Sequence, residues 1–386
     1  MSIKGKAYIA GVFEHPTRRA DAFGLAELHA ACAKGALDDA GLTLRDVDGL
    51  FCAGAPGFGP LSLADYLGVN VRHMDTTELG GAAYVSHVSH AAQAIMAGKC
   101  SVALIVLAGR PKADGVALVS GGATDRSPDT EFEAPYGPNV VNNYAMATMR
   151  HMFEYGTTSE QLAWVKVAAS HHAQHNPHAV LRDVVTVADV INSPMIADPL
   201  HRLDCCVISD GGGALVVVSP EVMRSLGGKR VRVLGGGEAF KGQAGGNVDL
   251  TYTAARQSGA IAFTEAGITP ADVKYASIYD SFTITVLMQL EDLGFCDKGK
   301  GGGFVSDGNL ISGVGSLPVN TDGGGLCNNH PGNRGGMTKV IEAVRQLRGE
   351  SHPAVQVKDC DIALVHGTGG DIGLRHAGST LLLERA

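Results

Sequence analysis

The chain has 386 residues, a formal net charge of −8 and 45% hydrophobic residues. This length can bury a large core and form two domains, while the acidic balance argues against a nucleic-acid or membrane surface and favours a small-molecule ligand. The eight cysteines lack CxxC spacing, the first 15 residues lack a signal-peptide pattern, and the longest apolar runs are only strand-sized. These features predict a cytoplasmic protein that needs no disulfides.

Alternating strand and helix signals, separated by glycine-rich turns, predict an α/β fold with buried strands. The first 15 residues predict a strand. Residues 36–49, ALDDAGLTLRDVDG, predict a helix that ends at Gly41 and leads into an apolar strand. Residues 78–100, ELGGAAYVSHVSHAAQAIMAGKC, predict a turn of small residues and then a helix that ends at Gly98, and residues 100–109 predict the next strand.

The same unit occurs twice along the chain. AFTEAGITPADVKY at residues 262–275 repeats the helix, glycine and Asp-Val pattern of residues 36–49. A second unit, AAQAIMAGKCSVALIVLAG, has a later counterpart in IEAVRQLRGESHPAVQVKDCDIALVHGTGG. Two repeats in the same order indicate duplicated α/β lobes. The predicted domains are an N-terminal lobe at residues 1–225, with an inserted loop region at about residues 110–200, and a C-terminal lobe at residues 226–386.

Five segments carry a resemblance to a known family: residues 151–177, residues 199–221 (PLHRLDCCVISDGGGALVVVSPE), residues 278–282 (IYDSF), residues 320–336 (NTDGGGLCNNHPGNRGG) and residues 366–370 (HGTGG). Together they resemble the thiolase superfamily, in particular its sterol-carrier-protein-type branch and the thiolase-like aldolases that lack the nucleophilic cysteine. The resemblance implies two duplicated α/β lobes in a layered αβαβα arrangement. It also implies a coenzyme A thioester as substrate and no bound cofactor.

The family's nucleophile is missing from this chain. Thiolases of this type carry a cysteine in the turn before the first lobe's helix, and counting back from Gly98 places that position at Gly81, or at Ala82 if the spacing slips by one. The family's second, acid/base cysteine is not evident either. Cys327 lies three residues before His330 and could substitute, although packing is the favoured interpretation of this thiol.

Other residues at the family's motif positions can still carry chemistry. The resemblance places Tyr279 and Asp280 where the family usually has His-Asp, and it places His330 in the family's Gly-His-Pro motif. His366 in HGTGG corresponds to a variant of the sterol-carrier branch. A phenol can donate a hydrogen bond to the thioester oxygen, and an imidazole can act as base or acid near neutral pH. We therefore predict Tyr279, His330 and His366 as candidate catalytic residues, with Asp280 and Cys327 as further candidates.

A retro-aldol reaction fits a site without a nucleophile. Claisen cleavage transfers an acyl group and needs a residue to hold it, whereas retro-aldol cleavage needs only a base and an oxyanion hole. Either His330 or Tyr279 could be the base, because the aldolases that this chain resembles tend to carry tyrosine where His330 stands. The backbone N–H groups predicted to form the oxyanion hole are those of Gly80, Gly81, Ala82, Gly369 and Gly370.

The leading hypothesis is retro-aldol cleavage of a 3-hydroxyacyl-CoA. An acyl-CoA acyltransferase that uses Cys327 as an atypical nucleophile is the second hypothesis, and a non-catalytic acyl-CoA-binding scaffold is the third. The histidine pairs of the sequence lack an evident third ligand and its glycine runs do not match nucleotide-binding loops, so no metal or nucleotide site is expected.

The expected assembly is a homodimer, joined through an edge of the first lobe's sheet at the apolar strand 100–109. The resemblance to thiolase-like aldolases adds a small acyl-CoA-binding partner with an OB-fold and a zinc ribbon. No nucleic-acid or membrane partner is expected.

Overall fold

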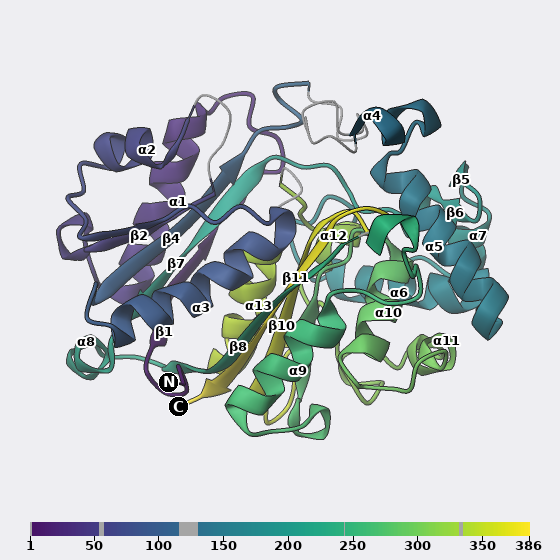
Figure 1. Ribbon diagram of the computed structural model, residues 1–386. Helices are drawn as coiled ribbons and strands as arrows, with labels where there is room; N and C mark the ends of the chain where they lie inside the picture. Colours follow the sequence, from purple (N-terminus) through teal and green to yellow (C-terminus); the bar gives the residue numbers. More distant parts are fainter. Residues whose placement is uncertain (1, 54–57, 116–129, 243, 332–334) are drawn as a thin grey trace.

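The computed structural model describes residues 2–53, 58–115, 130–242, 244–331 and 335–386. In these residues a mixed sheet of nine strands has helices on both faces (Figure 1). Its strands are β1 (Tyr8–Glu14), β2 (Gly49–Phe51), β3 (His73–Asp75), β4 (Val102–Gly109), β7 (Gly211–Val218), β8 (Val231–Lys241), β9 (Tyr275–Ile278), β10 (Ile362–Gly370) and β11 (His376–Arg385). The short strands β5 (Met195–Ala197) and β6 (Leu200–His201) form a separate pair.

The helices fall into long packed helices and short one- or two-turn helices. The long ones are α1 (Leu25–Ala40), α3 (Ala83–Met96), α5 (Val140–Tyr155), α6 (Ser159–Ala173), α9 (Ala255–Ala266), α10 (Thr283–Asp292) and α13 (Gly336–Arg348). The short ones are α2 (Pro60–Leu67), α4 (Thr130–Glu133), α7 (Val187–Ile191), α8 (Pro220–Ser225), α11 (Gly301–Val305) and α12 (Gly324–Cys327). No helix in the described part of the chain has the length and apolar composition of a membrane span.

The two halves of the sheet repeat one another. The strand order is β3-β2-β4-β7-β1-β8-β11-β10-β9, and β1 and β8 meet in the middle through the pairs Tyr8–Arg232 and Ile9–Val231. Outward from this junction, both halves begin with two antiparallel pairings and a parallel one: β1–β7–β4–β2 in the first and β8–β11–β10–β9 in the second. The first half continues with a further parallel pairing, of β2 with β3. The predicted lobes therefore share one continuous sheet.

The duplicated segments form matching elements, as predicted. Helix α1 ends before Gly41 at φ +70°, and α9 ends before Gly267 at φ +68°. Each left-handed glycine is followed by a short 3₁₀ turn, capped by Thr43 and Asp46 in the first copy and by Thr269 and Asp272 in the second. Each turn leads into a strand, β2 or β9, that pairs in parallel with its neighbour.

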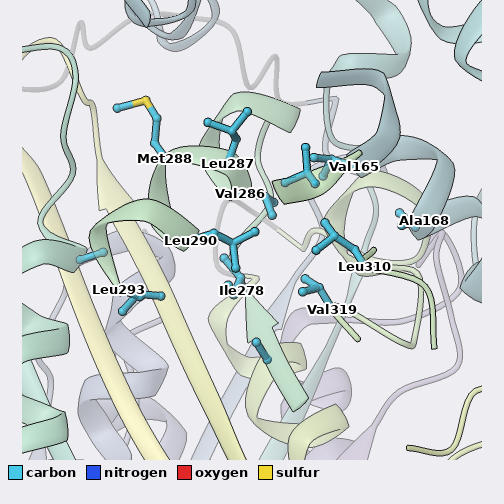
Figure 2. Packing of buried hydrophobic residues seen from close by; sticks show 14 of the residues in the cluster. Val165, Ala168, Ile278, Val286, Leu287, Met288, Leu290, Leu293, Leu310 and Val319 are labelled. Carbon is cyan, nitrogen blue, oxygen red and sulfur yellow. The ribbon is translucent and has the colours of Figure 1, made fainter. Parts of the chain in front are cut away.

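Three apolar clusters define the layers of the molecule. One packs α1, α2 and α8 on the outer face of the first half-sheet, and another packs α5, α6, α9 and α10 on the outer face of the second. The third lies between the halves, around α3 and α13, and includes residues of strands from both. Figure 2 shows the second outer cluster, where Leu290 of α10, Val165 of α6 and Ile278 of β9 gather. These clusters give the predicted αβαβα layering.

One expectation about this fold was wrong. The strand predicted at residues 100–109 is β4, which pairs with β2 on one side and β7 on the other, so it is not an edge. The edges in the described sheet are β3 and β9. The region at about residues 110–200 is largely helical where it is described, because α5 and α6 bury apolar faces against α10. The predicted domain boundary after residue 225 lies between α8 and β8 and stays a prediction.

Close approach of α1 to the sheet predicts a stability effect at Gly11. A Cβ at this residue would lie 2.1 Å from the Ala36 carbonyl oxygen. We expect Gly11→Ala to lower the free energy of unfolding by about 1–3 kcal/mol through overpacking. Gly303→Ala is the control, since a Cβ there meets nothing within 4 Å. Urea unfolding of both variants measures the difference, and equal stabilities would contradict the predicted packing.

Candidate active site

The turn before α3 touches the end of β10. Gly80 has φ +56°, and a Cβ there would lie 3.1 Å from Gly369 Cα. A Cβ on Gly369 would lie 1.6 Å from the carbonyl oxygen of Leu79. Only glycine backbones can approach so closely, so the two segments predicted to supply oxyanion donors lie in direct contact. The Gly80 N–H already donates to Glu78 Oε1 at 2.9 Å, and Glu78 must move before that N–H can bind a ligand.

The side chain of Tyr279 occupies the space beside Gly81. A Cβ placed on Gly81 would lie 2.1 Å from Tyr279 Cε2, 2.5 Å from Tyr279 Cζ and 2.5 Å from the Thr368 carbonyl oxygen. Real Cβ atoms do not approach other atoms so closely. The tyrosine ring therefore lies where a cysteine side chain at Gly81 would have to begin.

Tyr279 and His330 form a hydrogen-bonded pair. The phenol oxygen lies 2.7 Å from His330 Nε2, and the two rings meet edge-on at 68° with centroids 5.3 Å apart. Tyr279 is 4% exposed and His330 is 2% exposed. Gly335 closes the other side, because a Cβ there would lie 3.2 Å from His330 Cδ2 and 3.3 Å from Tyr279 Cε2. The backbones of Gly81 and Gly335 therefore pack directly against the pair.

Electrostatics define the direction of this hydrogen bond. Burial raises the pKa of Tyr279 well above its usual value, so the phenol stays protonated. Burial and the nearby Lys339 cation lower the pKa of His330 to about 4, so the imidazole is neutral at pH 7. The Tyr279 hydroxyl therefore donates to Nε2, and this assigns the ring proton to Nδ1. Nδ1 is buried without a hydrogen-bond partner among the described residues.

Asp280 organises the segments around this pair. Its carboxylate accepts the N–H of Gly325 at 2.8 Å and that of Leu326 at 3.1 Å, which fixes α12 against the end of β9. It also pairs with Lys339 Nζ at 2.6 Å, and both side chains are 1% exposed. Lys339 was not among the residues predicted from the sequence. The available signal was one lysine within the apolar stretch MTKVIEAV that begins a buried helix.

Residues 205–209, within a motif of the family resemblance, connect the parts of the site. Cys206 N–H donates to the Ser281 carbonyl at 2.9 Å, and Val207 N–H donates to the Gly325 carbonyl at 2.9 Å. Ser209 Oγ accepts the His330 N–H at 2.8 Å and donates to Asn329 Oδ1 at 2.7 Å. This segment joins Ser281, α12 and the His330 loop.

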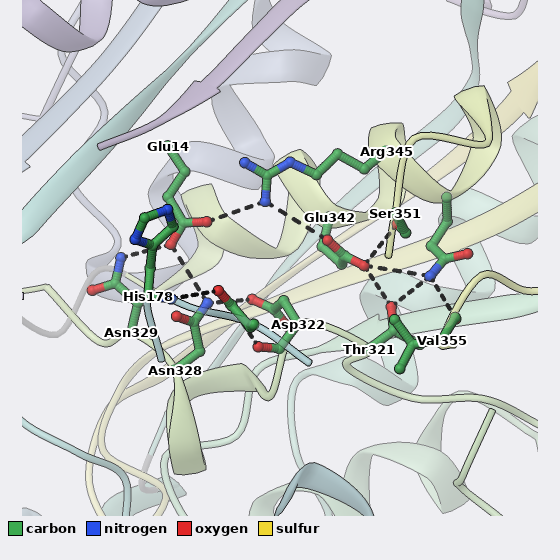
Figure 3. A network of polar contacts seen from close by, with 12 residues as sticks. Glu14, His178, Thr321, Asp322, Asn328, Asn329, Glu342, Arg345, Ser351 and Val355 are labelled. Atoms are coloured by element: carbon green, nitrogen blue, oxygen red, sulfur yellow. Dashed lines mark hydrogen bonds and ion pairs between the residues drawn. The ribbon is translucent and has the colours of Figure 1, made fainter. Parts of the chain in front are cut away.

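A buried polar network holds Asn328 and Asn329, the two residues before His330 (Figure 3). Glu14 of β1 accepts a hydrogen bond from Asn329 Nδ2 at 2.9 Å and pairs with Arg345 of α13 at 3.2 Å. Burial alone would raise the pKa of Glu14, but Arg18 and Arg345 hold it below its usual value. Asn328 Nδ2 donates to Asp322 Oδ2 at 2.9 Å. The first strand of the chain thereby fixes a loop more than 300 residues away in sequence.

Two predicted site residues do not touch the Tyr279–His330 pair. The His366 imidazole is bonded to Thr380 Oγ1 at 2.9 Å, its Nε2 has no hydrogen-bond partner in the described structure, and burial lowers its pKa to about 3. Only its carbonyl is used here, because it accepts the Tyr279 N–H. Cys327 is fully buried in the outer cluster and accepts a hydrogen bond from Lys166 Nζ at 3.2 Å. Burial raises the pKa of this thiol, which supports packing over nucleophilic attack.

The expected substrate tunnel stays a prediction. A cavity of about 410 Å³ is lined by His73, Asp75, His90 and Lys99, on β3 and around the C-terminal half of α3, and its lining does not include Tyr279 or His330. A cavity of about 10 Å³ lies beside Asp280 and Asn320. The described residues contain no group of three or more side chains suited to hold a metal ion.

Contact between Gly81 and Tyr279 predicts coupling between them. We expect Gly81→Ala to lower the free energy of unfolding by about 1–3 kcal/mol. It should cost less in a Tyr279→Ala background, where the two ring contacts are gone and the contact with the Thr368 carbonyl persists. A double-mutant cycle by urea unfolding measures the coupling. An equal cost in both backgrounds would show that the ring does not fill this space.

Comparison with known proteins places this geometry in a family. Residues 237–385 match the family described as "Thiolase C-terminal domain-like". The chain is 36% identical to the "Steroid side-chain-cleaving aldolase" of Thermomonospora curvata, over 90% of this chain and 92% of that protein. It is 32% identical to the "17-hydroxy-3-oxo-4-pregnene-20-carboxyl-CoA lyase" of Mycobacterium tuberculosis, over 95% and 97% of the two chains.

Another similar protein is named as an acetyltransferase and not as an aldolase or lyase. The "Acetyl-CoA acetyltransferase" of Methanothermobacter thermautotrophicus is 34% identical over 88% of this chain and 90% of its own. The solved structure of the "Ltp2-ChsH2(DUF35) aldolase" superposes with a TM-score of 0.88 at 33% identity, covering 99% of this chain and 98% of that one. The chain therefore belongs to the thiolase superfamily.

Proposed function

We propose that this protein is a thiolase-like carbon–carbon lyase that cleaves a 3-hydroxyacyl-CoA by a retro-aldol reaction. One observation carries the proposal: the Tyr279 ring fills the space where a nucleophilic side chain at Gly81 would stand. Acyl transfer through a covalent intermediate requires such a nucleophile. Retro-aldol cleavage requires a proton acceptor and a stabilised oxyanion, both of which the surrounding groups can supply.

The proton path begins at the substrate hydroxyl. Tyr279 donates its own proton to His330 Nε2. Its oxygen also interacts with the backbone N–H of Gly335, which leaves one lone pair to accept the proton of the β-hydroxyl. As that proton moves to Tyr279 and the phenol proton moves to His330, the bond between Cα and Cβ breaks. The β-oxygen keeps a C=O double bond, and the electron pair of the broken bond becomes the thioester enolate.

The enolate is held and then protonated. We assign stabilisation of its oxygen to backbone N–H groups of the Gly80–Ala82 turn. The Gly80 N–H must first leave Glu78 Oε1, and the Ala82 N–H must leave the Leu79 carbonyl, to which it donates at 3.1 Å. Burial and the Lys339 cation lower the pKa of His330 to about 4, which makes its imidazolium more acidic than an ordinary one, so it returns its proton through Tyr279 to Cα. The products are an aldehyde or ketone and a shortened acyl-CoA, with no net change in protons and no requirement for free coenzyme A or a bound cofactor.

The names of the relatives support this proposal. Two similar proteins are named as an aldolase and a lyase, and a solved structure with a TM-score of 0.88 is that of a protein named as an aldolase. The relative named as an acetyltransferase keeps acyl transfer as a second candidate, but Cys327 is fully buried and lies against Lys166. A non-catalytic scaffold would have no use for a hydrogen-bonded phenol–imidazole pair.

We further propose the assembly and location of the protein. The name of the similar Ltp2-ChsH2(DUF35) aldolase joins two proteins, which supports a partner protein. An OB-fold and a zinc ribbon in that partner are what the family resemblance implies. A homodimer joined through an edge strand is supported by β3 at the end of the sheet. A cytoplasmic location is supported by the eight free cysteines.

Three substitutions test the chemistry. We expect His330→Ala and Tyr279→Phe each to lower kcat/KM for 3-hydroxyacyl-CoA cleavage by about 10²–10⁴, because each removes one step of the proton path. Cys327→Ala is the control and should retain most of the activity. The readout is release of the carbonyl product and the shortened acyl-CoA by liquid chromatography. Loss of activity in Cys327→Ala, with retention in His330→Ala, would replace the aldolase with a covalent acyl transfer.

A further inference from the structure

Lys339 is a buried cation that the proton path above does not use. Its side chain and that of Asp280 are each 1% exposed, and Nζ lies 2.6 Å from Asp280 Oδ1. A buried ammonium is costly even when it is paired. We therefore examine which neighbouring groups the Lys339 ammonium affects.

The Lys339–Asp280 ion pair joins the segments that carry the two reacting side chains. Asp280 directly follows Tyr279 in the chain, and its oxygens hold the N–H groups of Gly325 and Leu326 in the segment leading to His330. Lys339 lies in the first turn of α13, four residues after Gly335, whose Cβ position touches both rings. The ion pair is therefore built into the frame around the Tyr279–His330 hydrogen bond.

We propose that Lys339 is a positioning residue whose buried ammonium, anchored by Asp280, keeps the His330 imidazole neutral with Nε2 accepting from Tyr279. The catalytic meaning of this inference rests on the proposed retro-aldol function. The ion pair acts on the reaction through His330 and does not contact the reacting atoms itself.

The groups around His330 favour this role. Tyr279 faces the imidazole as a neutral phenol. Asp280 Oδ1 and His330 Cδ2 lie 3.0 Å and 3.1 Å from the same point, the Cβ position of Gly325, and Lys339 Nζ lies 2.6 Å from that carboxylate oxygen. Asp322, before α12, interacts electrostatically with Lys339, and burial raises the pKa of its carboxyl. After burial, the Lys339 cation is the next cause that lowers the pKa of His330. A positive charge behind the ring opposes a second positive charge on it.

The ammonium has a consequence for the reaction. When Tyr279 passes its proton to Nε2, the new imidazolium lies near the Lys339 cation, and their repulsion favours return of that proton. The same proton then goes back to the phenol as the phenol protonates Cα of the enolate. Lys339 therefore keeps His330 unprotonated before the reaction and shortens the lifetime of its imidazolium during it. The lysine does not gain or lose a proton itself.

Titration of His330 in the absence of substrate tests the proposal. Protein with ¹³C-labelled histidine is titrated by NMR, and the His330 signal is assigned by its loss in His330→Asn. In the wild type we expect this signal not to titrate between pH 5.5 and 8. In Lys339→Met we expect its midpoint to rise by about one pH unit or more towards the ordinary value near 6.5. Lys166→Met is the matched control, a buried lysine that contacts Cys327, and should leave His330 unchanged.

Two further proteins keep the test decisive if Lys339→Met does not fold. Lys339→Met/Asp280→Asn replaces both charges by neutral side chains and should still raise the His330 midpoint, while Lys339→Arg keeps the charge and should preserve the wild-type behaviour. A wild-type His330 that titrates near pH 6.5, or a folded charge-free variant with an unshifted midpoint, would overturn the proposal. The NMR titrations need no turnover, so they test the role of Lys339 independently of the aldolase reaction, which kinetics test. If both hold, the acid limb of the pH profile of kcat/KM in Lys339→Met should move to higher pH together with the NMR midpoint of His330.

Discussion

Contact between the Tyr279 ring and the backbone of Gly81 is the constraint on which the site depends. It leaves no room for a side chain at Gly81, so a nucleophilic side chain cannot stand at that residue. It also places the ring at the turn before α3, whose neighbouring residue, Gly80, lies against Gly369. The same ring donates its hydrogen bond to His330. One ring position therefore excludes a side chain at Gly81 and sets the hydrogen bond of the Tyr279 phenol.

The rest of the fold supplies the precision that this contact requires. Within the second half-sheet β9 pairs with β10, so Tyr279 follows one strand while its N–H donates to the carbonyl of His366 on the other. Helices α3 and α13 lie between the halves and present the glycine turn and Gly335 to the same point. Glu14, Ser209 and Asp280 then fix the loop before α13 through hydrogen bonds to residues distant in sequence.

The sequence predicted the parts of this arrangement that depend on local pattern. The repeat of residues 36–49 at 262–275 was readable because left-handed glycines and capping residues leave signals within a few positions. The edge assigned to strand 100–109 was wrong because its neighbours are set by the order of the whole sheet. The family resemblance placed Tyr279 and His330 in one site, and the structure brings the two side chains within hydrogen-bond distance. The partner of Asp280 could not be read, since Lys339 lies more than 50 positions away and matches no motif of the resemblance. His366 matched a motif of the resemblance, but its imidazole is hydrogen-bonded to the Thr380 hydroxyl.

The central claim is that carbon–carbon cleavage proceeds here without an acyl-enzyme. The most direct measurement is turnover of a 3-hydroxyacyl-CoA by the purified protein, with its partner where one is required, in buffer depleted of free coenzyme A, followed by intact mass spectrometry of the quenched chain. The account predicts a carbonyl product and a shortened acyl-CoA in equal amounts, with the chain at its unmodified mass. Cleavage that depends on added coenzyme A, together with an acyl adduct on the chain, would contradict it.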